Sequence, residues 1–143
     1  MGEPIVINKK SFIPLGKIRY SYGRGFWEEW FLKGESNKEY WLSIDEGDFA
    51  LERPINIPMP FNSFNELIVG KEYGKYIVTE MGIGECVGFE GELPKIVKIG
   101  DTHKYAHLSK GGASLVTVEL VDDKISTYLG EWIDPFSIHG VYE

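Results

Sequence analysis

The stretch Phe26-Trp27-Glu28-Glu29-Trp30-Phe31-Leu32 decides the fold class. In a β-strand, alternate side chains point to opposite faces of the sheet. One face would carry Phe26, Glu28, Trp30 and Leu32, and the other Trp27, Glu29, Phe31 and Lys33. Because neither face is purely polar, we expect a strand that is covered on both sides, with at least one glutamate held against aromatic surface.

The rest of the chain has the residue types of short β-strands, because Val, Ile, Tyr, Phe, Trp and Thr recur in runs that Gly, Asn and Asp interrupt. The sequence therefore predicts an all-β, antiparallel fold, a barrel or a sandwich, which could consist of two small sub-sheets. The expected strands are 15–22, 26–33, 40–44 and 49–52, a hairpin of 73–81 and 85–90 that turns across 82–84, a strand at 96–99, a hairpin of 115–121 and 124–129, and a last strand at 136–142.

The length of 143 residues predicts a single domain, residues 1–143. Pro54, Pro58 and Pro60 each remove a backbone donor and fix φ. We therefore expect an extended crossing segment at 53–63, and residues 54–63 are the candidate junction between two sub-domains.

The net charge of −7 argues against a nucleic-acid partner and against docking onto anionic lipid, because both need a basic surface. Cys86 is the single cysteine, which excludes an intrachain disulfide and fits a reducing compartment. Neither a signal peptide nor an apolar run long enough for a transmembrane helix is visible. We expect a cytoplasmic protein without direct membrane insertion.

Glu29 is the candidate functional carboxylate. With Trp27, Trp30 and Trp41 it could line an aromatic, acidic pocket, which suits amines through cation–π contact and charge. Glu29 or Glu28 could also act as a general acid or base with a raised pKa. The alternative is a structural carboxylate that accepts a hydrogen bond from a Trp N–H or an Arg.

The other candidate chemistry is incomplete. His103 and His107 share a face in a strand, but with Asp101 they make a poor zinc shell, so we predict no metal site. Cys86 lies among small and apolar residues and reads as a buried small hydrophobe. The sequence predicts no catalytic residue set and no cofactor.

A family resemblance adds to this interpretation. The pattern Trp27-x-Glu29-Trp30-x-Leu32, followed by Tyr40-Trp41-Leu42, an acidic turn and Phe49-x-Leu51, resembles the bacterial domain of unknown function 4178 family. Gly130-Glu131-Trp132 near the end is compatible with it. The resemblance implies gene neighbourhoods with membrane-stress proteins and a polyamine-synthase-like enzyme. It therefore implies an accessory or scaffold role and supplies no catalytic residues.

Three hypotheses follow. The first is a non-enzymatic cytoplasmic adaptor that binds a protein partner, linked to a bacterial membrane-stress system. The second is a binding module for a small amine-like ligand, with Trp27, Glu29, Trp30 and Trp41 in its pocket. The third is a hydrolase-like enzyme that uses Glu29 with His103, His107 or His139. Open sheet edges could also pair two copies into a homodimer.

Overall fold

The computed structural model describes residues 2–56 and 58–140, and its regular structure is almost entirely β-strand. The helices in these ranges are three single 3-10 turns, at Glu35–Asn37, Phe64–Glu66 and Pro135–Ser137. None of the helices in the described part of the chain could span a membrane. The prediction of an all-β, antiparallel fold is confirmed.

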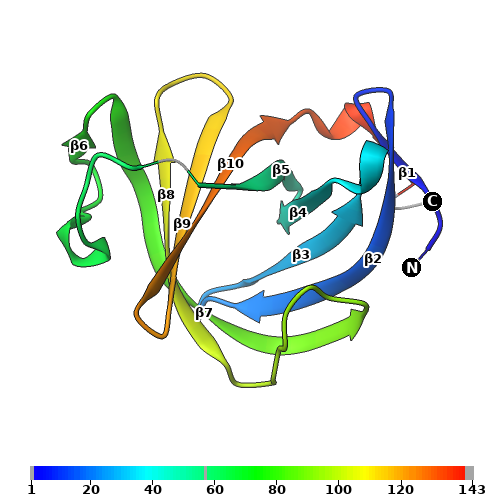
Figure 1. The fold of residues 1–143 in the computed structure, drawn as a ribbon, viewed down its shortest axis with the longest axis horizontal. Coiled ribbons are helices and arrows are strands. Elements are labelled where there is room, and N and C mark those ends of the chain that lie inside the picture. Colours follow the sequence, from blue (N-terminus) through cyan, green and yellow to red (C-terminus); the bar gives the residue numbers. More distant parts are fainter. Residues whose placement is uncertain (1, 57, 141–143) are drawn as a thin grey trace.

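Eight strands close into one antiparallel barrel (Figure 1). Of the two predicted architectures, barrel and sandwich, the structure is the barrel. The strands on both sides of residues 54–63 belong to the same sheet. In order around the wall, the barrel strands are β2 (Lys10–Ser21), β3 (Phe26–Lys33), β4 (Glu39–Asp45), β5 (Asp48–Ile55), β10 (Lys124–Ile133), β9 (Ser114–Val121), β8 (Thr102–Ser109) and β7 (Tyr76–Gly91).

The barrel closes where β2 pairs with β7. Gly16 lies opposite Gly91 at this seam. A Cβ on Gly16 would overlap the backbone of Glu92, and a Cβ on Gly91 would overlap the backbone of Leu15. The two glycines therefore allow the backbones to approach closely enough for closure.

Two apolar clusters cover the outside of the barrel. The segment after β5, which includes the short strand β6 (Glu72–Tyr73), packs Phe64 and Leu67 onto β8 and β9. It lies on the left of Figure 1. At the other side of the barrel, β1 (Ile5–Ile7) pairs with β2 and with β11 (Ile138–His139), and it packs against Leu32 of β3.

The interior of the barrel holds the third cluster, which is largely aromatic. Trp27 and Phe31 of β3 belong to it, while Leu32 lies in the cluster outside. The inner face of β3 is covered as predicted, whereas on the outer face Leu32 is buried and Phe26 is 50% exposed. The members of the interior cluster are Ile18, Tyr20, Trp27, Phe31, Trp41, Cys86 and Tyr105.

The predicted hairpin across 82–84 is wrong, because β7 runs unbroken through these residues. A Cβ on Gly82 would lie 2.6 Å from the hydroxyl oxygen of Tyr105, and a Cβ on Gly84 would overlap the ring of Trp27. Gly82 and Gly84 are not turn residues. Because they have no side chain, they leave room for aromatic rings inside the barrel.

Other boundaries also differ from the prediction. Residues 96–99 form a loop, and β5 continues to Ile55, with Pro54 opposite Tyr128. The predicted hairpin around Asp122-Asp123 is confirmed, and both residues have positive φ, 48° and 64°, as its tight turn requires. The last predicted strand, 136–142, reduces to Ile138–His139, and its residues 141–142 lie outside the described ranges.

Candidate functional site: a polar cavity inside the barrel

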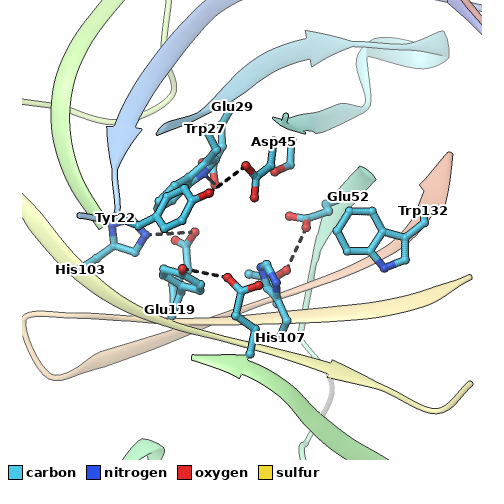
Figure 2. Close-up of a pocket in the computed structure, with 13 residues that line it drawn as sticks. Tyr22, Trp27, Glu29, Asp45, Glu52, His103, His107, Glu119 and Trp132 are labelled. Carbon is cyan, nitrogen blue, oxygen red and sulfur yellow. Dashed lines mark hydrogen bonds and ion pairs between the residues drawn. The ribbon is translucent and has the colours of Figure 1, made fainter. Parts of the chain in front are cut away.

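Three glutamates project into the barrel from three strands. Glu29 comes from β3, Glu52 from β5 and Glu119 from β9, and all three line one cavity (Figure 2). The alternation of each strand turns these carboxylates inward together with the aromatic rings. An apolar residue would be expected at each of these positions in a core, so the interior is built around polar groups.

The cavity has a volume of about 40 Å³. By the usual requirement of about 10–15 Å³ per water molecule, it has room for two or three waters or one small polar group. Its walls combine acidic, imidazole, hydroxyl and indole groups: Tyr22, Trp27, Glu29, Ser43, Asp45, Glu52, Glu80, His103, Tyr105, His107, Thr117, Glu119 and Trp132.

Glu29 accepts a hydrogen bond from the indole Nε1 of Trp27 at 3.2 Å. Burial, and then the negative charge of Glu119, raise the pKa of Glu29 to about 7. Lys95, His103 and the Trp27 hydrogen bond act in the opposite direction. Burial therefore shifts Glu29 toward its protonated form.

Glu52 is the more deeply buried carboxylate, at 5% exposure. It accepts a hydrogen bond from the hydroxyl of Thr117 at 2.9 Å. Burial raises the pKa of Glu52 to about 8, and the negative charge of Glu29 contributes to the same effect. Burial therefore favours the protonated form of Glu52 when the cavity holds no cation.

His103 and Glu119 face each other between these groups. The Nε2 atom of His103 lies 3.9 Å from an oxygen of Glu119, which is too long for a hydrogen bond. Burial lowers the pKa of His103 and raises that of Glu119, so both side chains favour their neutral forms. His103 is 8% exposed, and its Nε2 is the one fully buried side-chain nitrogen or oxygen within 2–56 and 58–140 that lacks a hydrogen-bond partner.

The outer part of the cavity carries two tyrosine–carboxylate pairs. The hydroxyl of Tyr22 donates to Asp45 at 3.2 Å, and that of Tyr105 donates to Glu80 at 3.0 Å. Desolvation is the first cause that raises the pKa of Tyr105, and the charge of Glu80 adds to it. These pairs place further negative charge beside the cavity.

A second hollow reaches the same cluster from the side of the loop between β7 and β8. It has a volume of about 330 Å³, and His103 and Glu119 line it as well as the cavity. We call this hollow the vestibule. Lys95 of that loop lines it too, together with Tyr20, Cys86, Ile96, Val97, Asp101, Thr102, Val121, Asp122, Lys124, Ser126 and Tyr128.

A family model described as "Domain of unknown function (DUF4178)" matches residues 1–135. The chain belongs to the DUF4178 family. The resemblance seen in the sequence is thereby confirmed. No curated protein and no solved structure shows a significant match to this DUF4178 chain.

The DUF4178 barrel brings together three of the four residues predicted to form a pocket. Trp27 and Glu29 line the cavity, and Trp41 contacts the space between the glutamates and Lys95. Trp30 does not join them, because it has the opposite strand parity and lies on the outer face. Its indole donates to Glu28 at 3.2 Å, and the Nζ atom of Lys17 lies 5.4 Å from its ring centroid.

Sequence reasoning missed Glu52 and Glu119 as site residues of this DUF4178 chain. The signal was present, since both glutamates sit in strands where their neighbours Leu51 and Leu120 are apolar. The sequence does not show that β10 lies between these two strands and brings both glutamates into one cavity. His103 was considered as a metal ligand and as a histidine partner of Glu29 in a hydrolase-like enzyme, and it does line the cavity with Glu29. No metal-binding group of three His, Cys, Asp or Glu residues is found within 2–56 and 58–140.

Proposed function

We propose that this DUF4178 chain is a binding module that takes a small organic cation into its barrel. The observation that carries the proposal is the set of three glutamates, Glu29, Glu52 and Glu119, around one cavity. His103, nine-tenths buried and without a hydrogen-bond partner, points to an absent ligand at the same place. Trp41 supplies a ring face for a cation, since the Nζ atom of Lys95 lies 5.5 Å from its ring centroid.

The energetics of the carboxylates support a cation. A buried carboxylate without a counter-ion is costly, and it responds by keeping its proton. Glu29 and Glu52 do so, with pKa values raised to about 7 and about 8. A bound cation would supply the missing charge, so binding would ionise these groups and release protons.

Isothermal titration calorimetry tests the proposal. The probes are n-butylammonium chloride and tetramethylammonium chloride, with n-butanol as the neutral comparison. We expect at least one cation to bind and n-butanol not to bind. Cation affinity should fall about tenfold or more in Glu29→Gln and Glu119→Gln, because each removes a carboxyl group that could ionise beside the bound cation.

Glu28→Gln is the matched control, since Glu28 neighbours Glu29 in the sequence but lies on the outer face, with its carboxylate 3.7 Å from Lys17. Its affinity should equal that of the wild type. Binding of neither cation at millimolar concentration, or equal binding of n-butanol, would overturn the proposal.

A second candidate function is a cytoplasmic adaptor that binds a protein partner in a bacterial membrane-stress system, as the family resemblance implies. It is favoured by exposed apolar side chains on the loop between β7 and β8, where Ile96 is 90% and Ile99 64% exposed. Such residues are typical of interaction surfaces when they cluster. A partner that co-purifies with the wild type and is lost in the Ile96→Ser, Ile99→Ser double variant would support this role, and equal recovery with both would count against it.

A further inference from the structure

Lys95 already brings an ammonium group to the proposed cation site. Its Nζ atom lies 5.5 Å from the ring centroid of Trp41, in cation–π contact. The same close-packed spot is bounded by Tyr128 and by the three glutamates of the cavity, Glu29, Glu52 and Glu119. The chain thus places one of its own cations where the carboxylates converge.

The charge of Lys95 acts on these carboxylates. It lowers the pKa of Glu29 and of Glu119, against the larger effect of burial. Lys95 nevertheless takes part in none of the direct ion pairs of the described residues. It belongs to a loop, it is exposed as a whole residue, and its neighbour Ile96 is 90% exposed. Lys95 is therefore attracted to the site without being locked into it.

We propose that the ligand is an unbranched primary alkylamine and that Lys95 is a tethered competitor for its place. This inference rests on the proposed cation-binding function. Lysine is itself a primary ammonium on an unbranched alkyl stem, and it reaches the carboxylates along the vestibule of about 330 Å³. A free amine of the same form can follow the same path once the lysine leaves.

The polar groups at the site favour a primary ammonium over a quaternary one. A primary ammonium has three N–H donors, whereas a tetraalkylammonium has none. Glu29 and Glu119 offer acceptor oxygens, and the unpartnered Nε2 of neutral His103 offers an acceptor when its other ring nitrogen carries the proton. Desolvating these acceptors without donors is costly, so they discriminate against the quaternary cation.

Calorimetry on three proteins tests the inference: the wild type, Lys95→Met, and Lys98→Met as the matched control. Lys98 lies on the same loop but does not line the vestibule or the cavity. We expect n-butylammonium to bind more tightly than tetramethylammonium to the wild type. If Lys95 occupies the site nine-tenths of the time, its removal should tighten n-butylammonium binding about tenfold. Lys98→Met should bind like the wild type.

A second measurement needs no variant. The ring of Trp41 should shift the ε-methylene proton signals of Lys95 in the NMR spectrum of the wild type. Saturating n-butylammonium should return these signals toward those of an exposed lysine and leave the Lys98 signals unchanged.

The outcomes distinguish failure of the Lys95 inference from failure of the proposed cation-binding function. Unchanged or weakened n-butylammonium binding in Lys95→Met, or tighter binding of tetramethylammonium than of n-butylammonium, overturns the inference and leaves cation binding standing. Lys95 signals that do not move on saturation also overturn it. Binding of neither cation to any of the three proteins overturns the proposed function itself.

Discussion

Glu52 lies on the barrel wall with a single described hydrogen-bond partner, the hydroxyl of Thr117. Burial raises the pKa of Glu52 to about 8 in the folded protein, while its pKa in the unfolded chain is about 4.3. The folded state therefore holds a proton that the unfolded chain loses. The stability from this group is full below about pH 4 and is lost as the pH rises toward 8.

Glu52→Gln should for this reason gain stability relative to the wild type as the pH rises from 5 to 8. Gln cannot ionise, and its side-chain oxygen can still accept from Thr117. The gain is at most about 1.4 kcal/mol per pH unit. Urea unfolding at pH 5, 6.5 and 8 measures it. Glu28→Gln on the outer face is the control and should show no such trend. A stability difference between Glu52→Gln and the wild type that is the same at all three pH values would contradict the prediction.

At the scale of the residue, the sequence predicted Glu29 as a site residue because its neighbours in the structure are also its neighbours in the chain. Glu29 stands between aromatic residues of its own strand, and Trp27, two positions away, donates its hydrogen bond. Glu52 and Glu119 depend on partners in distant strands, so their role follows from closure of the barrel. Trp30 was misplaced because a Trp-x-Glu-Trp pattern puts its two indoles on opposite faces of a strand.

At the scale of the element, β7 offers a matched pair of glycines. A Cβ on Gly84 would overlap the ring of Trp27 and lie 2.9 Å from His103 Cε1, whereas a Cβ on Gly88 would meet no atom within 4 Å. Gly84→Ala should therefore lower the free energy of unfolding by about 1–3 kcal/mol, because it overpacks the interior. Urea denaturation of the purified variant measures the loss.

Gly88→Ala is the control for backbone effects, and we expect a change within about 0.5 kcal/mol. Equal losses in the two variants would show that strand propensity, not the interior ring, sets the cost. A Gly84→Ala protein as stable as the wild type would mean that Trp27 can move aside.

The elements were predictable where local chemistry decides them. Asp122-Asp123 turns a hairpin because both residues tolerate positive φ. Gly82 and Gly84 misled, because a glycine that ends a strand and a glycine that makes room for a ring from another strand look the same in a sequence. Pro54 likewise reads as a strand breaker, although β5 continues through it.

At the scale of the whole molecule, cation binding should depend on pH. The titratable groups that face the site come from the barrel strands and their loops: Tyr20, Tyr22, Glu29, Asp45, Glu52, Glu80, Lys95, His103, Tyr105, His107, Glu119 and Tyr128. The pKa values of Glu29 and Glu52, raised to about 7 and about 8, mean that a cation must displace protons below pH 8.

The affinity for n-butylammonium should therefore rise between pH 6 and 8, by up to about tenfold per unit for each proton released. It should then level off until the amine itself loses its charge. Calorimetry in two buffers with different ionisation enthalpies counts the protons released, and we expect between about one and two at pH 6.5, because Glu29 and Glu52 both ionise on binding. Equal affinity at pH 6 and pH 8, with no proton release, would contradict the prediction.

The β character of the whole chain was predictable because residue type and alternation report on single strands. The closed barrel was not, since it depends on two pairings between distant segments, β5 with β10 and β2 with β7. Sequence patterns carry no record of which strand lies beside which. The cavity exists only because of these two pairings, so most of the site residues could not be predicted from the sequence.

The seam between β2 and β7 also has an expected consequence for the kinetics of folding. Neighbouring strands such as β3 and β4 pair over short loops, whereas the seam joins segments far apart in the chain and must overcome a larger loop-closure entropy. In the unfolded chain Glu29, Glu52 and Glu119 face water and are ionised at neutral pH. We expect closure of the barrel to couple folding to proton uptake, so refolding followed by tryptophan fluorescence should be slower at pH 8 than at pH 6.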